Sequence, residues 1–209
     1  MYYACASAKK GGCVAAAVPT AKQLLNPVSL FSQDNNGTII ELPTISASGE
    51  ISVTGALVFG IGTRDNNGLG QATVLQLDGY GEFLTKYPTT ATNPSFAFID
   101  SGSNALYFAS ANILRCTQYP GFYCPKSTTS LSAINQDAAG VVAVTVDFSI
   151  ANAETLFART NNVAYYNLGG SSAVGGSFDW GLPFYFGRNV FTAIEGQSTP
   201  AGTGPYVAF

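Results

Sequence analysis

The residues best suited to chemistry lie around Asp100, which follows an apolar run and is followed by Ser101-Gly102-Ser103. A carboxylate here would sit at the edge of a core with hydroxyl groups around it. The alternative is an ordinary turn residue, since Asp, Ser and Gly are all favoured in turns. Histidine is absent, which excludes Ser-His-Asp and Cys-His catalysis and every His-ligated metal site. Any chemistry must therefore come from carboxylates, hydroxyls or backbone amides.

The composition indicates a β-rich fold. The chain has 209 residues, of which 23 are glycine, 12% are aromatic and 10% are charged. Such a chain is too apolar to be disordered and too rich in glycine for a helical bundle. Its net charge is −3, and no segment gathers enough lysine or arginine to neutralise a phosphate backbone. We therefore expect no nucleic-acid partner.

The four cysteines form two local pairs of equal spacing, Cys5 with Cys13 and Cys116 with Cys124. Small and turn-forming residues separate the partners, and neither pair is a Cys-x-x-Cys. We therefore expect two disulfides, no metal site and no cofactor. The alternative is four free or buried thiols in a cytosolic protein. Disulfides together with few charges favour an extracytoplasmic location, either periplasmic or secreted.

The chain opens with Met1-Tyr2-Tyr3 and lacks the basic start and apolar stretch of a signal peptide. The signal is therefore expected on a missing upstream segment. No run of eighteen apolar residues occurs, so no membrane span is expected. Residues 1–20 are small and weakly patterned, and we expect them to be a connecting segment truncated from a longer chain.

Hydrophobic patterning between glycine and proline breaks predicts a single β domain over residues 21–209. Short helices are expected at residues 20–25, 110–114 and 153–157, the last capped by Asn152. Strands are expected at residues 28–32, 38–42, 51–61, 72–77, 95–100, 105–108, 140–149, 162–168, 184–195 and 206–209.

The tetrapeptide Asp-Asn-Asn-Gly occurs twice, at residues 34–37 and 65–68, each time between apolar runs. Asn-Gly readily adopts the positive φ angles of a hairpin turn, so both copies are predicted to be turns. A calcium-binding loop is the alternative, but neither copy continues to the glutamate that such a loop needs.

The segment around Asp100 resembles the Asp-Thr/Ser-Gly-Ser/Thr loop of pepsin-like aspartic peptidases, in which two apolar residues lead into the aspartate, as Phe98 and Ile99 do here. Residues 188–195 resemble the strand after the last glycine motif of the pepsin C-terminal lobe, and residues 204–209 resemble its closing strand. Residues 27–32 and 55–60 are similar to the run that precedes the second aspartate. The resemblance implies a mostly β fold, a single pepsin-like C-terminal lobe of antiparallel strands with a few short helices.

A closer resemblance is to a bacterial family catalogued as domain of unknown function thirty-four forty-three, whose chains resemble whole pepsin-like proteins with an Asp-Thr-Gly motif in each half. The chain resembles the C-terminal half of these proteins in five sequence segments, at residues 34–37, 57–63, 98–104, 121–125 and 178–183. Two departures stand out. The glycine before the last segment aligns with Pro183, with Gly181 as an alternative. The Asp-x-Gly-Ser motif occurs once, because Asp78-Gly79-Tyr80 and Asp179-Trp180-Gly181 lack the following hydroxyl.

The resemblance implies a role for each residue of the motif. Asp100 would be one of two catalytic aspartates and Ser101 would link the two loops through its hydroxyl. Gly102 would permit close approach, and Ser103 would hydrogen-bond the outer oxygen of the carboxylate. Peptide hydrolysis of this kind needs two carboxyl groups that share a proton, so a lone monomer is expected to be inactive.

The expected partners are the missing N-terminal lobe or a second copy of the chain, and the expected substrate is a peptide. The alternative function is a non-catalytic secreted β domain with a binding or surface-structural role.

Overall fold

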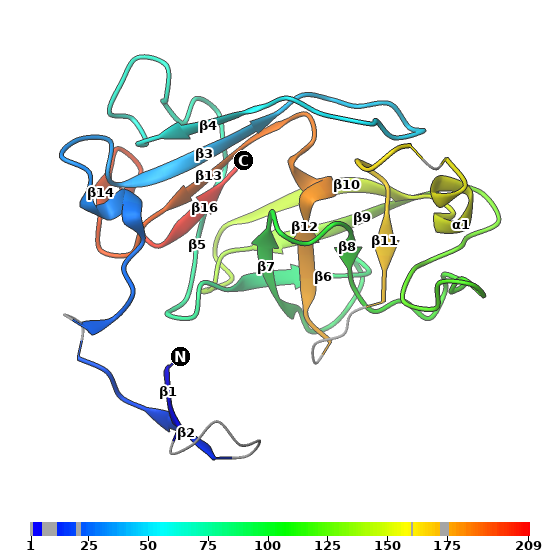
Figure 1. Cartoon of the computed structure of the whole chain (residues 1–209), viewed down its shortest axis with the longest axis horizontal. Coiled ribbons are helices and arrows are strands. Elements are labelled where there is room, and N and C mark those ends of the chain that lie inside the picture. The colour runs from blue at the N-terminus through cyan, green and yellow to red at the C-terminus, as the bar shows by residue number, and fades with distance from the viewer. Residues whose placement is uncertain (1, 6–11, 20–21, 160, 172–175) are drawn as a thin grey trace.

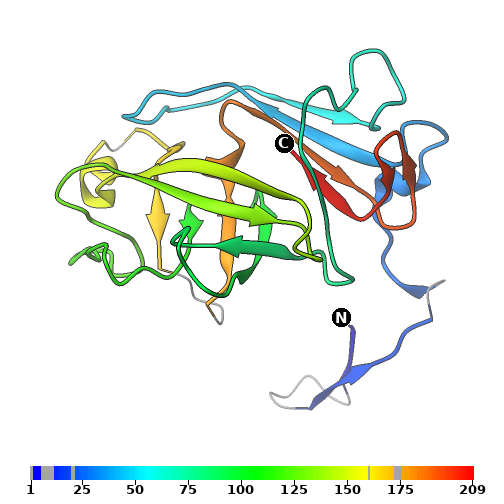
Figure 2. The same cartoon turned by 180° about the vertical axis from the view of Figure 1, so that it is seen from behind.

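The protein is described by a computed structural model that covers residues 2–5, 12–19, 22–159, 161–171 and 176–209. It is mostly β and is built on two large sheets that lie side by side, while the hairpin β1–β2 projects away from both (Figures 1 and 2). The strands are β1 (Tyr2–Cys5), β2 (Cys13–Ala16), β3 (Gly37–Leu42), β4 (Ala56–Phe59), β5 (Val74–Gln76), β6 (Phe83–Lys86), β7 (Ser95–Asp100), β8 (Leu106–Tyr107), β9 (Thr129–Gln136), β10 (Ala143–Ile150), β11 (Gly169–Gly170), β12 (Phe178–Gly181), β13 (Arg188–Ala193), β14 (Ser198–Thr199), β15 (Gly202–Thr203) and β16 (Tyr206–Ala208). The helical segments are η2 (Pro27–Leu30), α1 (Ala153–Phe157) and η3 (Leu182–Tyr185).

The seven-stranded sheet has the order β10-β9-β6-β7-β12-β8-β11. Its strands are mostly antiparallel, but β12 lies parallel to β7 on one side and antiparallel to β8 on the other. The chain thus returns from a distant part of the sequence to fill the space between two strands that are close in sequence. This insertion sets residues of β12 directly beside the end of β7.

The five-stranded sheet has the order β4-β3-β13-β16-β5 and is antiparallel throughout. Strand β13 pairs with β3 over its full length and follows directly from β12 and η3. The segment from β12 to β13 therefore joins the two sheets.

Aromatic side chains fill the core of the seven-stranded sheet. Phe178 stacks on Trp180 with ring centroids 4.2 Å apart, and Phe108 stacks on Phe178 at 4.9 Å. Trp180 is fully buried, and its indole N–H donates to Thr85 Oγ1 at 3.0 Å. The hydroxyl of Thr85 in turn donates to Asn135 Oδ1 at 2.7 Å, whereas Asn135 Nδ2 is buried and has no hydrogen-bond partner among the described residues.

Both expected disulfides are present, Cys5 with Cys13 and Cys116 with Cys124. The first closes the β1–β2 hairpin, and the second closes a loop against α1 in the larger body of the protein. Among the described residues, no helix is long and apolar enough to cross a membrane.

Several predicted elements are confirmed. The strand at residues 95–100 is β7, the strands at 38–42 and 206–209 correspond to β3 and β16, and the helix at 153–157 is α1. Asn152 caps α1, because its side chain accepts the N–H of Thr155 at 3.0 Å.

Other predicted elements are wrong. Residues 28–32 overlap the 3-10 helix η2 instead of a strand, since Pro27 begins that turn and Asn26 caps it. Residues 110–114 form no helix and residues 162–168 form no strand. For the predicted helix at 20–25, residues 20 and 21 lie outside the described part, and residues 22–25 form no α-helix. Strands β6, β9 and β12 were not predicted.

The two Asp-Asn-Asn-Gly segments meet at one end of the β3–β4 pair, because one segment leads into β3 and the other follows β4. The second copy forms a turn at Asp65 and Asn66, as predicted, whereas the first copy is a bend whose Gly37 already begins β3; neither is the tip of a hairpin between adjacent strands. Asn36 is buried; its amide donates to Ile61 O at 3.0 Å and to Ser198 O at 3.0 Å, and its oxygen accepts the Ile61 N–H at 2.8 Å. Asn67, also buried, accepts the N–H of Arg64 and donates to Phe59 O.

Candidate functional site

Asp100 is the last residue of β7 and its carboxylate is held by the turn that follows. Alternation along the strand puts Phe96, Phe98 and Asp100 on one face and the fully buried Ala97 on the other. The N–H of Gly102 donates to Asp100 Oδ1 at 2.8 Å, and Ser103 Oγ lies 2.9 Å from Asp100 Oδ2. Both carboxylate oxygens therefore have a partner inside this short loop.

Gly181 lies directly beside this loop, in register with Asp100 across the parallel β7–β12 pair. A Cβ at this position would be 2.1 Å from Ala105 O and 2.7 Å from Ser103 O, so only glycine fits. The next residue, Leu182, donates its N–H to Ser103 O at 2.7 Å. The glycine that packs behind Asp100 is therefore Gly181, the alternative given above. Pro183, the position that the resemblance favoured, is buried in η3.

Ser101 is exposed and interacts with Tyr185 of η3. Burial and the charge of Asp100 raise the pKa of Tyr185 to about 12, and hydrogen bonding with Ser101 opposes that increase. Within this chain, the hydroxyl of Ser101 thus contacts the segment after β12. A contact with a second lobe remains a prediction.

Asp179, one strand away on β12, completes the site. It is in register with Phe98 of β7 and Tyr107 of β8, so its side chain lies on the same face as Asp100. Ser103 Oγ lies 2.6 Å from Asp179 Oδ2, so one hydroxyl bridges two carboxyl groups. Burial, together with the nearby charge of Asp100, raises the pKa of Asp179 to about 6, against the lowering effect of the Ser103 hydrogen bond.

Asp179 was not predicted to be a site residue, because Asp179-Trp180-Gly181 lacks the hydroxyl residue that follows Gly102 in the Asp100 motif. The signal was a different one: an acidic residue between two large aromatic residues, Phe178 and Trp180, in a strand that must be largely buried. A carboxyl group in a largely buried strand usually has a hydrogen-bond or ion-pair partner.

A groove of about 610 Å³ lies on the opposite face of β12 from Asp179. Trp180 and Phe184 form part of its wall, and Arg188 reaches into it, donating to Phe184 O at 2.7 Å. Burial lowers the pKa of Arg188. This groove does not include Asp100, so it is separate from the carboxyl pair.

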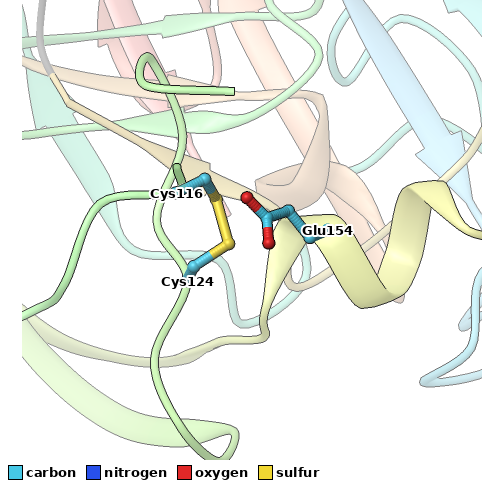
Figure 3. Close-up of side chains that lie close together, drawn as sticks. All are labelled: Cys116, Cys124 and Glu154. Carbon is cyan, nitrogen blue, oxygen red and sulfur yellow. A yellow bond between two sulfur atoms is a disulfide. The ribbon is translucent and has the colours of Figure 1, made fainter. Parts of the chain in front are cut away.

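One further group of metal-ligating residue types comes together at α1, where Cys116, Cys124 and Glu154 lie within 4.8 Å of one another (Figure 3). Both sulfur atoms belong to the disulfide and are not thiolates. Glu154 accepts the N–H of Gln118 at 2.8 Å. The group therefore fastens a loop to the helix and has no free thiolate to offer a metal.

The loop of residues 100–103 places the carboxyl group of Asp100 near that of Asp179, whose pKa is raised, and the hydroxyl of Ser103 contacts both. Such an arrangement suits general acid–base chemistry, in which one group accepts a proton while another keeps one.

Among known proteins, the chain matches one family model. No curated protein and no solved structure matches the chain. The family model described as "Protein of unknown function (DUF3443)" matches residues 1–209. The chain therefore belongs to the DUF3443 family.

Proposed function

We propose that this chain supplies Asp100 to an aspartic hydrolase of pepsin-like type, whose second aspartate comes from another lobe or another copy of the chain. The observation that carries the proposal is the geometry of the Asp100 loop. A strand ends in an aspartate whose two oxygens are held by Gly102 and Ser103, with Gly181 packed behind the loop. A surface turn would not need a glycine from a strand about eighty residues away.

In the proposed reaction, Asp100 and the second aspartate share one proton. The ionised carboxylate accepts a proton from a water molecule as that water attacks the peptide carbonyl carbon. The protonated carboxyl hydrogen-bonds the carbonyl oxygen and stabilises the charge that develops there. The tetrahedral intermediate then collapses as the amine leaves with a proton from the acid.

The face around Asp100 is suited to a partner. Phe96 shares this face and is 59% exposed, and Phe98 and Tyr107 are partly exposed beside it. An apolar, open surface around a carboxylate would be covered by the second lobe or by an extended peptide substrate.

An extracytoplasmic location, in the periplasm or outside the cell, is part of this proposal. Its support is the pair of disulfides, since such bonds persist in oxidising compartments.

The test is cleavage of a mixed peptide library from about pH 3 to pH 7, using the chain alone and the chain co-expressed with the sequence encoded upstream of Met1. We expect the chain alone to be inactive and the assembled protein to cleave. The variant Asp100→Asn should abolish cleavage, because the amide keeps the shape of the carboxyl but cannot ionise.

Asp147→Asn is the matched control, because Asp147 also contacts a serine hydroxyl, Ser132 Oγ at 2.5 Å, but lies on β10 away from the site. It should cleave as the wild type does. If the assembled wild type cleaves nothing, or the Asp100→Asn variant stays active, the hydrolase proposal is wrong. The non-catalytic β domain with a binding role then replaces it.

A further inference from the structure

The hydroxyl of Ser103 stands between two carboxyl groups. Its oxygen lies 2.9 Å from Asp100 Oδ2 and 2.6 Å from Asp179 Oδ2. Three strands fix this arrangement: Asp100 ends β7, Asp179 lies on β12, and Ser103 follows the turn at residues 101–102 that leads to β8. Gly181 leaves no room for the loop to move toward β12.

The cluster of Asp100, Ser103 and Asp179 needs one more proton than it has when both carboxyl groups are ionised. The two short contacts around Ser103 Oγ require two hydrogens, and the hydroxyl supplies one. With both carboxyl groups ionised, one of the two contacts would be a close approach of two oxygen atoms with no hydrogen between them. The geometry is satisfied when one carboxyl is protonated and donates to Ser103 Oγ, while Ser103 donates to the other.

The surroundings identify Asp179 as the carboxyl that holds the proton. Its Oδ1 is buried and has no hydrogen-bond partner in the part of the chain that the structure describes. Asp100, in contrast, receives the Gly102 N–H on its Oδ1. A carboxylate with an unpaired buried oxygen is costly, whereas a neutral carboxyl in the same place is tolerated.

The titratable groups that face Asp179 are Asp100 from β7, Tyr107 from β8 and Tyr185 from η3. None is a cation, and no lysine or arginine of the described residues forms an ion pair with Asp179. In the part of the chain that the structure describes, no neighbour therefore supplies a positive charge to an ionised Asp179.

We propose that Asp179 is a positioning residue for Asp100: while protonated it donates to Ser103 Oγ and so turns the hydroxyl hydrogen of Ser103 toward Asp100, and once ionised it competes with Asp100 for that same hydrogen. This inference rests on the proposed hydrolase function. Burial and the charge of Asp100 raise the pKa of Asp179 to about 6, which agrees with a proton held there in weakly acidic solution. No proton leaves Asp179 for the substrate; only the direction of two hydrogen bonds depends on it.

The first arm of the test does not involve activity. The carboxyl carbons of the aspartates are followed by NMR through a pH titration, and the Asp179 signal is assigned by its loss in Asp179→Asn. We expect its midpoint near 6 in the wild type. Asp100→Asn should lower the midpoint and Ser103→Ala should raise it, each by at least about half a pH unit, because one removes a neighbouring charge and the other removes a hydrogen-bond donor.

Asp147→Asn is again the control and should leave the Asp179 midpoint unchanged. If the midpoint lies near 4, or is the same in the wild type, Asp100→Asn and Ser103→Ala, the coupling does not exist and the inference is overturned. That outcome leaves the proposed hydrolase function intact, because Asp100 can still act with a second aspartate.

The second arm uses the assembled protein. Asp179→Asn mimics the protonated form permanently, since its amide can donate to Ser103 Oγ at every pH. We expect the high-pH limb of the kcat/KM profile to move upward by about one pH unit in this variant, with little change in KM at pH 5. A limb that does not move overturns the inference. An assembled wild type that cleaves nothing refutes the hydrolase function instead, and the NMR arm still decides whether the two carboxyl groups are coupled.

Discussion

Two aspartates of this protein contact a hydroxyl group in similar ways and yet differ in their affinity for protons. Asp34 contacts Thr63 Oγ1, and its other close neighbour is Arg64, whose Nη2 lies 2.9 Å from Asp34 Oδ2. Hydrogen bonds from Arg64 and Thr63 lower the pKa of Asp34. Asp179 contacts Ser103 Oγ, but its pKa is raised to about 6 by burial and by Asp100.

The difference shows that the hydroxyl does not decide the protonation state. In both clusters it stabilises the ionised carboxylate. Burial is the largest cause of the raised pKa of Asp179, and the negative charge of Asp100 adds to it, whereas the hydrogen bond from the Arg64 guanidinium is the largest cause of the lowered pKa of Asp34. The Asp34 cluster is thus a structural ion pair at the surface, and the Asp179 cluster is suited to holding a proton.

The largest expected loss of stability comes from adding a side chain at Gly181, which lies against the loop that carries Asp100 and Ser103. Gly181→Ala would place a Cβ 2.1 Å from Ala105 O, a backbone atom that cannot move aside cheaply. We expect a loss of on the order of 3 kcal/mol or more in the free energy of unfolding, measured by urea denaturation. Gly68→Ala is the control, because a Cβ there meets nothing within 4 Å, and its unfolding midpoint should match the wild type. Equal stability of the two variants would show that β12 does not lie against the Asp100 loop.

The next largest loss of stability is expected at Asn36, which holds in place the segments that carry Asp34, Thr63 and Arg64. Asn36→Ala removes a buried amide that makes three hydrogen bonds, leaving both backbone groups of Ile61 and the carbonyl of Ser198 without that partner. We expect a loss of about 2 to 4 kcal/mol. Thermal unfolding is the measurement, and Asn66→Ala, which changes an exposed residue of the second tetrapeptide, should leave the unfolding temperature unchanged. If the two variants unfold alike, the buried amide does not hold the turns together.

A smaller effect of opposite sign is expected for Asp179→Asn. The raised pKa of Asp179 means that its contribution to stability is complete below about pH 4, its unfolded value, and is lost as the pH rises through about 6. The asparagine variant lacks this loss, so it should be more stable than the wild type at pH 7 by about 1 kcal/mol, after allowance for partial exposure of the side chain. Chemical denaturation at pH 4 and pH 7 tests this, with Asp147→Asn as the control. A variant less stable than the wild type at pH 7 would contradict the proton-holding role.

The smallest effect is expected for Asp34→Asn. A lowered pKa contributes stability at pH values above the unfolded value of about 4, and this contribution is lost as the pH falls through the folded value. The variant should therefore be slightly less stable than the wild type at pH 7 and equal to it in strong acid. Because Arg64 is half exposed, added salt should narrow the gap. A gap that persists in strong acid and high salt would mean that Asp34 acts through the geometry of its hydrogen bonds with Thr63 and Arg64 and not through its charge.

The sequence predicted the local parts of this fold well. The strand at residues 95–100 was predicted with its bounds, because apolar residues lead into Asp100 and a glycine turn follows. The cap of α1 by Asn152 and the two disulfides were also predicted, since their partners lie within a few residues of one another.

The parts that depend on distant pairing were not predicted. Strand β12 has an acid at its centre, which breaks the apolar run, and its place between β7 and β8 is set by pairing with residues about eighty positions earlier. Gly181 was therefore predicted only as an alternative to Pro183, and Asp179 was not predicted to be a site residue. Both matter through what lies opposite them, and local spacing carries no information about that.

The insertion of β12 between β7 and β8 also fixes an order of assembly during synthesis. Strands β7 and β8 leave the ribosome well before Phe178, so their facing edges have no partner until residues 178–181 arrive. Unpaired strand edges bind other chains readily, and long-range pairings form slowly. A nascent or truncated chain that ends before residue 178 would thus have every residue of the Asp100 loop but neither the glycine behind it nor the strand that closes the sheet. Such a chain would be prone to aggregation, and the carboxyl pair would be among the last features of the fold to form.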